Sequence, residues 1–211
     1  MSSVPPTFGL VLAGGLARRM GGGDKARLTI GGATILDRVL ASLSGQTVGI
    51  AINANGDPAR FVDTGLPVIP DNVPDHPGPL AGILAGLDWL AAQNTGVEWM
   101  LSVPGDCPFL PDDLVERLHA ARRQKGAGVP LACARSGEWR HPVVALWPLA
   151  LREDLRRALT VEDLRKIEVW TARHGVAVAD WPDQPVDPFF NVNTPDDAKR
   201  AESIAAQYNA G

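Results

Sequence analysis

The chain has 211 residues, of which 45% are hydrophobic and 21% charged, enough apolar material for one core, so we expect a single domain over residues 1–211. The formal net charge of −4 argues against a nucleic-acid partner, which would require a basic stripe on the surface. No apolar run approaches the roughly 18 residues of a membrane span, and the N-terminus lacks the charge of a secretory signal, so we expect a cytoplasmic protein without a membrane partner.

Short β-type runs alternate with amphipathic helical segments along most of the chain. The expected strands are Thr7–Ala13, Val48–Asn53, Leu66–Ile69, Trp99–Val103, Gly128–Ala134, His141–Trp147 and Val176–Ala179. Apolar residues recur at helical spacing between them, over residues 35–43, 80–90 and 114–118. This alternation is typical of an α/β fold, in which helical crossovers join parallel strands and cover the sheet.

Turn and cap residues set several boundaries. Residues 136–137 predict a hairpin turn. Gly175 predicts the end of a helical segment over Val161–His174. Thr194 is expected to cap a final helix that begins at Pro195.

Two tryptophans and both cysteines carry structural expectations. Trp139 and Trp181 lie in polar segments, so we expect them on the surface. Cys107 and Cys133 show no C-x-x-C spacing, so we interpret them as buried thiols rather than metal ligands.

The most informative motif is the glycine-rich segment LAGGLARRMGGGDK at residues 12–25. Glycines let backbone N–H groups approach a ligand, and Arg18, Arg19 and Lys25 supply positive charge, as a polyphosphate requires. The segment is neither a Walker A loop nor a G-x-G-x-x-G fingerprint. Taken alone, it is as consistent with a flexible turn beside solvated arginines as with a nucleoside triphosphate loop.

Polar or glycine residues follow four of the expected strands. Gly14 and Gly15 follow the first, Asn53 ends the second, and Asp71 and Asp106 follow the third and fourth. Ligands of open parallel sheets bind at the carboxyl ends of the strands. Four segments therefore converge on one edge, which favours the phosphate interpretation of the loop.

Asp106 is the strongest candidate for a metal ligand. Pro104 and Pro108 bracket it and restrict its backbone. Mg²⁺ prefers one or two carboxylates together with phosphate oxygens and waters. Aspartate is also an ordinary turn residue, but its position at a strand end beside a phosphate loop favours the metal.

The remaining candidates keep two interpretations each. Asn53 either hydrogen-bonds a base or ribose or provides turn chemistry. Asp71 either accepts from ribose hydroxyls or from N1–H and the exocyclic amine of guanine, or is a solvated loop acid. Gly78 and Leu80 either frame a base edge or belong to a segment of small residues that packs tightly.

Two amides near the C-terminus are candidates for a second substrate. Asn191 and Asn193 lie just before the expected final helix, where they either face that substrate or satisfy local backbone groups. His141 is a candidate neighbour of the same acceptor site. The four histidines show no metal-ligand spacing.

Together these motifs resemble the molybdenum cofactor guanylyltransferases of the nucleotidyltransferase superfamily. The resemblance covers nearly the whole chain, through residues 12–15, 18–21, 24–25, 53–55, 77–82, 105–111 and 191–195. Leu16 is a departure, since relatives often carry a lysine there, and phosphate charge is then left to Arg18, Arg19 or Lys25.

The resemblance implies a Rossmann-like three-layer α/β sandwich with a mostly parallel sheet. It implies that the enzyme binds GTP and Mg²⁺, joins GMP to the terminal phosphate of molybdopterin or its molybdenum-loaded form, and releases pyrophosphate. Residues of about 1–106 would form the GTP and Mg²⁺ half, and about 107–211 the acceptor half. A cofactor-delivery protein and the apo-forms of molybdoenzymes or their chaperones would be protein partners.

The resemblance also implies site residues. The nucleotide would contact Leu12, Ala13, Gly14, Lys25, Asn53, Asp71 and Asp106. The sequence patterns described above add Gly15, Gly78 and Leu80 to the expected nucleotide contacts. Arg19, Lys25 and Asp106 would act in catalysis, with Asp106 holding the metal. From their position before the final helix, Asn191 and Asn193 are expected to bind the acceptor.

Two alternatives stay open. A cytidylyl- or sugar-nucleotidyltransferase of the same fold would use the same loop with another base and acceptor. A nucleotide-sensing or carrier module would bind both ligands and catalyse nothing.

Overall fold

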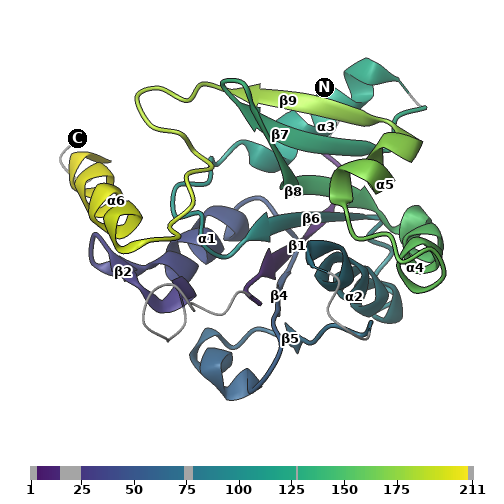
Figure 1. The fold of residues 1–211 in the computed structure, drawn as a ribbon, viewed down its shortest axis with the longest axis horizontal. Coiled ribbons are helices and arrows are strands. Elements are labelled where there is room, and N and C mark those ends of the chain that lie inside the picture. Colours follow the sequence, from purple (N-terminus) through teal and green to yellow (C-terminus); the bar gives the residue numbers. More distant parts are fainter. Residues whose placement is uncertain (1–3, 15–24, 74–77, 127, 209–211) are drawn as a thin grey trace.

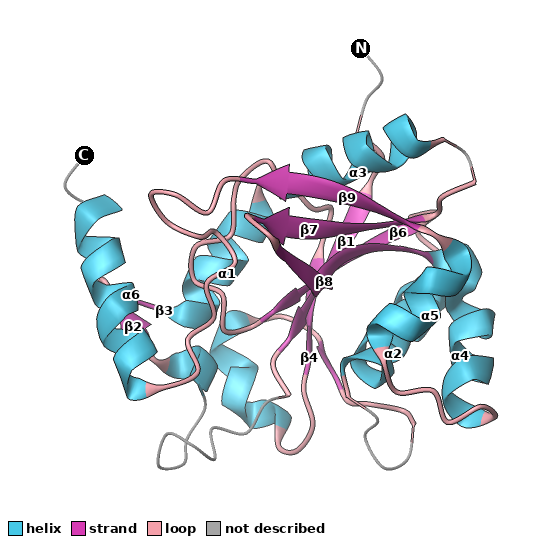
Figure 2. Cartoon of the chain, turned by 45° about the horizontal axis from the view of Figure 1, so that its top comes forward, coloured by secondary structure: helices cyan, strands magenta, loops and turns pink. Residues whose placement is uncertain are grey.

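A seven-stranded sheet forms the centre of the computed structural model, which describes residues 4–14, 25–73, 78–126 and 128–208 (Figures 1 and 2). Its strand order is β5-β4-β1-β6-β8-β7-β9. The strands are β1 Thr7–Leu12, β4 Ile50–Asn53, β5 Val68–Ile69, β6 Trp99–Pro104, β7 Leu131–Ser136, β8 Trp139–Pro148 and β9 Val176–Trp181. A separate two-stranded sheet pairs β2 Thr29–Ile30 with β3 Ala33–Thr34.

The strand directions confirm a mostly parallel sheet. Strands β5, β4, β1 and β6 run parallel to one another, and β7 runs parallel to β9. Strand β8 is antiparallel to both of its neighbours. The expected hairpin joins β7 to β8: Ser136 pairs with Trp139, and Gly137 adopts a φ of 53° that suits glycine.

Helices cover both faces of the sheet, which confirms the three-layer α/β sandwich (Figure 1). The α-helices are α1 Ile35–Ser44, α2 Pro79–Ala92, α3 Leu114–Lys125, α4 Arg152–Thr160, α5 Ile167–His174 and α6 Pro195–Tyr208. The short 3-10 helices are η2 Lys25–Arg27, η3 Pro58–Thr64 and η4 Leu149–Leu151.

Alternation along the strands divides the core into two clusters. Val11 of β1 belongs to the cluster that includes residues of α1, α3 and α6. The preceding residue, Leu10, points to the other face and belongs to the cluster with α2, α4 and α5. The sheet is continuous across residue 106, the expected boundary between the two halves.

Several local expectations are confirmed and two are wrong. Cys107 and Cys133 are buried, and Trp139 is 77% exposed. Trp181 is 6% exposed, because it ends β9 on the inner face and its indole N–H donates to Asp113 Oδ1 at 2.8 Å. The helix expected over Val161–His174 is shorter, since α5 begins only at Ile167.

The start of α5 has a backbone cause. Asp163 has a φ of 48°, in the left-handed region, so residues after α4 turn instead of continuing as a helix. The amide of Leu164 donates back to the carbonyl of Ala158 at 2.9 Å and closes this turn.

No helix within the described residues is long and apolar enough to cross a membrane.

His119 predicts a measurable pH dependence of stability. Its Nε2 lies 2.9 Å from Thr7 Oγ1, which donates to the carbonyl of Pro5, while its buried Nδ1 lacks a hydrogen-bond partner among the described residues. Burial, followed by the charges of Arg122 and Arg123, lowers the pKa of His119 to about 4. Between the ordinary pKa near 6.5 and the folded pKa of about 4, His119 is therefore protonated in the unfolded chain but neutral in the folded chain. The free energy of unfolding consequently falls as the pH drops through this range.

We expect this histidine to remove about 2 kcal/mol from the free energy of unfolding between pH 7.5 and pH 5. The variant His119→Gln keeps a donor near Thr7 but does not titrate. Urea unfolding at both pH values should therefore show a smaller loss in the variant than in the wild type. Equal losses in the two proteins would contradict this role of His119.

Candidate active site

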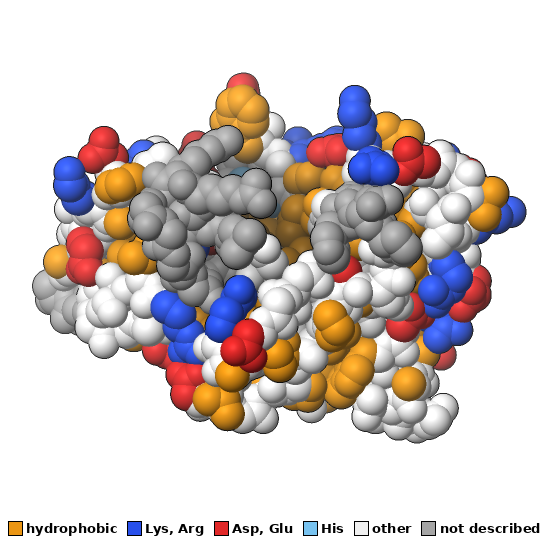
Figure 3. All heavy atoms as spheres, turned by 60° about the horizontal axis from the view of Figure 1, so that its bottom comes forward, with side chains coloured by type: hydrophobic (Ala, Val, Ile, Leu, Met, Phe, Trp, Pro, Cys, Tyr) orange, Lys and Arg blue, Asp and Glu red, His pale blue; other side chains and the backbone are white. Residues whose placement is uncertain are grey.

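The carboxyl ends of β1, β4, β5 and β6 meet at one edge of the sheet, as the sequence predicts. Beside them lies a cavity of about 370 Å³, and Figure 3 shows a hollow near the centre of one face with hydrophobic side chains in it. The cavity is lined by Leu12, Gly14, Asn53, Asn55, Asp71, Gly78, Pro79, Pro104 and Val143. Five predicted nucleotide-binding residues therefore surround one space: Leu12, Gly14, Asn53, Asp71 and Gly78.

Backbone hydrogen bonds carry the sheet register into the loops at this edge. The amide of Ala13 donates to the carbonyl of Asn53 at 2.8 Å, and the amide of Ala54 donates to that of Ile69 at 3.1 Å. On the other side of β1, the amide of Gly105 donates to the carbonyl of Leu12 at 2.9 Å. These bonds fix the main chain at the ends of β1, β4 and β6, and therefore the points from which the following loops leave the sheet.

Asn53, Asn55 and Asp71 form a polar network in the cavity wall. Asn53 Nδ2 donates to Asp71 Oδ1 at 2.9 Å and to the carbonyl of Ile69 at 3.0 Å. Asn55 Nδ2 donates to Asp71 Oδ2 at 2.8 Å, and its Oδ1 accepts from the Asp71 amide at 2.9 Å. Each carboxylate oxygen thus has an amide donor, so its orientation is constrained.

Helix α2 fits against this network because it lacks a side chain at Gly82. A Cβ at that position would lie 2.2 Å from Asn53 Oδ1 and 3.0 Å from Leu12 Cδ2. The small residues predicted around this segment therefore serve close packing at Gly82. Leu80, the second residue of the same helix, is fully buried in the core and does not line the cavity, so the structure does not bring it to the predicted nucleotide contact.

Lys25 and Asn193 join segments from opposite ends of the chain. Lys25 Nζ donates to Asn193 Oδ1 at 2.7 Å. The main chain of Asn193 is fixed in turn, because its amide donates to Asp197 Oδ2 at 3.0 Å in the first turn of α6. A predicted phosphate contact and a predicted acceptor contact are therefore neighbours.

Asp106 lies directly after β6 and Gly105. Its carbonyl accepts from the amide of Val192 at 2.9 Å, which holds the 191–193 segment against it. Its Oδ1 is buried without a hydrogen-bond partner among the described residues. Burial raises the pKa of Asp106, while the positive charge of Lys25 acts in the opposite direction.

The buried oxygen of Asp106 fits a divalent cation. An unpaired carboxylate oxygen is costly inside a protein unless a cation or donor satisfies it. The described residues contain no group of three or more His, Cys, Asp or Glu side chains able to hold a metal. Mg²⁺ requires no such group when phosphate oxygens and waters complete its shell.

Asn191 and His141, two further predicted residues, lie in the described part of the chain. Asn191 accepts at Oδ1 from the thiol of Cys107, whose pKa burial raises well above its ordinary value, so this thiol is a neutral donor. His141 lies near this segment, with its ring centroid 4.7 Å from that of Phe189. Gly15 and Arg19, like Arg18, lie outside the described residues.

Sequence reasoning missed Asn55, Pro79, Pro104 and Val143 in the cavity wall. Asn55 was detectable, since it lies two residues beyond Asn53. Val143 was not, because its position depends on the antiparallel direction of β8 and on the shift in its pairing with β7.

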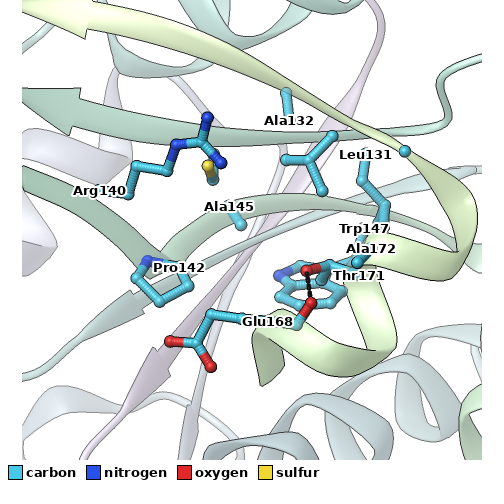
Figure 4. A pocket seen from close by; sticks show the side chains of 12 residues that line it. Leu131, Ala132, Arg140, Pro142, Ala145, Trp147, Glu168, Thr171 and Ala172 are labelled. Atoms are coloured by element: carbon cyan, nitrogen blue, oxygen red, sulfur yellow. Dashed lines mark hydrogen bonds between the residues drawn. The ribbon is translucent and has the colours of Figure 1, made fainter. Parts of the chain in front are cut away.

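A separate cavity of about 330 Å³ lies between β7, β8 and α5 (Figure 4). Its walls include Ala132, Ala145 and Trp147, with Arg140 and Glu168 at its side. None of the predicted site residues that the structure describes lines it. The predicted chemistry therefore concentrates at the carboxyl edge.

Comparisons with known proteins agree with this architecture. A molybdenum cofactor guanylyltransferase of Nitrobacter hamburgensis is 61% identical over 203 residues, covering 96% of each chain. Another, of Rhodopseudomonas palustris (strain BisB5), is 57% identical over 205 residues and covers 97% of each. The crystal structure of molybdopterin-guanine dinucleotide biosynthesis protein A from Archaeoglobus fulgidus matches with a TM-score of 0.71 and 26% identity, covering 95% of this chain and 99% of that one.

A protein-family model also matches most of the chain. The model described as the MobA-like NTP transferase domain matches residues 9–181. This range contains every strand of the central sheet except the first two residues of β1. The chain therefore belongs to the MobA-like NTP transferase family.

Proposed function

We propose that this chain transfers GMP from GTP to the terminal phosphate of molybdopterin, with or without molybdenum, and releases pyrophosphate. The names of its relatives support the two substrates. The observation that carries the proposal is the hydrogen bond of Lys25 to Asn193 together with the effect of its charge on Asp106, whose buried oxygen lies at the same sheet edge as the cavity of about 370 Å³. We infer that the phosphates of both substrates bind here, between the cavity that would hold the nucleoside and the Asn191–Asn193 segment that would hold the acceptor.

Asp106 would hold the Mg²⁺ on which we propose the transfer depends. The metal would neutralise charge on the phosphates when bound. Lys25 would add a fixed positive charge at the same edge, where it stabilises charge that develops on the phosphates. Arg19 is proposed as a further phosphate contact.

The acceptor needs no side-chain base. A phosphomonoester has a second pKa near 6 and is largely ionised at neutral pH. The contribution of the chain is therefore positioning: the Asn191–Asn193 segment would orient the acceptor phosphate, and the cavity would fix the nucleoside. A cofactor-delivery protein and molybdoenzyme apo-proteins or their chaperones are proposed partners on either side of the reaction.

Pyrophosphate release tests the proposal directly. Purified protein with Mg²⁺, GTP and molybdopterin should release pyrophosphate and form the guanine dinucleotide. Binding without release would instead indicate a carrier or sensing module. Tighter binding of CTP or UTP than of GTP would overturn the guanylyl assignment in favour of a cytidylyl- or sugar-nucleotidyltransferase.

A further inference from the structure

Asn55 holds both the main chain and the side chain of Asp71. Its Nδ2 donates to Asp71 Oδ2 at 2.8 Å, and its Oδ1 accepts from the Asp71 amide at 2.9 Å. Both residues line the same cavity. A single amide group thus fixes the position of the loop residue and the direction of its carboxylate.

The second donor, Asn53, constrains the carboxylate from the other side. Its Nδ2 bonds Asp71 Oδ1, and it is held by the carbonyl of Ile69 and by close packing against Gly82. With one amide donor on each oxygen, the carboxylate of Asp71 cannot rotate without breaking a hydrogen bond. Asn53 belongs to β4 and also donates to the carbonyl of Ile69, whereas Asn55 lies beyond the strand and bonds both the amide and the carboxylate of Asp71.

We infer that Asn55 is a positioning residue for base recognition, a role that rests on the proposed guanylyl function. A fixed carboxylate plane presents two oxygens side by side, which matches a base edge with two adjacent N–H donors. Guanine offers this edge through N1–H and its exocyclic amine, whereas cytosine and uracil do not. Asn55 acts through Asp71 and sets the angle at which the carboxylate meets that edge.

The pair GTP and ITP isolates this contact. ITP keeps the triphosphate, the ribose and N1–H of the base but lacks the exocyclic amine. For Asn55→Ala we expect the Kd of GTP to rise about tenfold and the Kd of ITP to rise about threefold or less, as measured by calorimetry. The preference for GTP over ITP should therefore fall at least about threefold.

Asn72→Ala is the matched control. Asn72 is the neighbour of Asp71 in the chain, is exposed, and donates to Asp88 Oδ2 outside the cavity. This variant should keep the GTP and ITP affinities of the wild type. Far-UV circular dichroism of both variants checks the fold.

Asn55→Asp separates positioning of the carboxylate from tethering of the loop. Aspartate keeps an oxygen that accepts from the Asp71 amide but replaces the donor to Asp71 Oδ2 with a negative charge. The GTP preference should fall in this variant as well. Retention of the preference would indicate that only the loop tether matters and would overturn the inference.

The remaining outcomes distinguish this inference from the proposed function. Equal weakening of GTP and ITP by Asn55→Ala, or no weakening, overturns the role of Asn55 while the wild type still prefers GTP to CTP. A wild type that binds CTP as tightly as GTP overturns the guanylyl function, and the inference falls with it.

Discussion

Asp106→Asn is expected to lower the rate of GMP transfer by at least about a thousandfold, because a catalytic metal contributes several kcal/mol to transition-state stabilisation. The substitution keeps the shape of the side chain and removes the charge that would hold Mg²⁺. In the wild type, Asp106 Oδ1 is buried and has no hydrogen-bond partner in the described part of the chain, and burial raises the pKa of this carboxyl, so the charge itself does not stabilise the fold. The Tm of the metal-free variant should therefore equal or exceed that of the wild type.

Pyrophosphate release across a Mg²⁺ titration measures this effect. Asp112→Asn is the matched control, because Asp112 lies in the loop that follows β6 but is exposed. It should retain the wild-type rate. Near-normal turnover of Asp106→Asn at low Mg²⁺ would place the metal on another residue.

Gly82→Ala is expected to weaken GTP binding more than tenfold and to destabilise the fold by about 1–3 kcal/mol, the usual cost of overpacking. The added methyl group would lie 2.2 Å from Asn53 Oδ1 and 2.8 Å from its Cγ. Asn53 cannot retreat without losing its bonds to Ile69 and Asp71. Although alanine favours helices by about 1 kcal/mol over glycine, the clash outweighs this gain.

Gly45→Ala provides the comparison for Gly82→Ala. Gly45 has a φ of −82°, and a Cβ there would meet no atom of the other described residues within 4 Å, its chain neighbours aside. Urea unfolding and GTP calorimetry should show little change in this variant. Wild-type GTP affinity in Gly82→Ala would mean that Asn53 moves freely and that its network does not shape the cavity.

The nucleotide edge could be predicted because its determinants are local. Gly14, Asn53, Asp71 and Asp106 each lie at or just beyond an apolar strand, and parallel strands bring such positions together. The hairpin between β7 and β8 could likewise be predicted from two adjacent residues, Ser136 and Gly137.

The features that escaped prediction depend on long-range packing. The helix expected from Val161 fails because Asp163 turns the backbone, a choice that helical periodicity does not encode. Trp181 lies among polar neighbours in sequence, but strand alternation turns it inward, against Phe189. The hairpin turn makes β8 antiparallel to β7, but the place of β8 between β6 and β7 has no signal in the order of the elements.

The pairing of β1 with β6 has a consequence for synthesis on the ribosome. Thr7 pairs with Trp99, and Leu12 pairs with Pro104. One edge of β1 therefore stays unpaired until β6, a strand from the middle of the chain, has been synthesised. Until that strand emerges, the nascent chain exposes an apolar edge of the kind that aggregates. Completion of the nucleotide edge therefore follows translation past Asp106, and slow elongation before that point would favour chaperone capture of the unfinished protein.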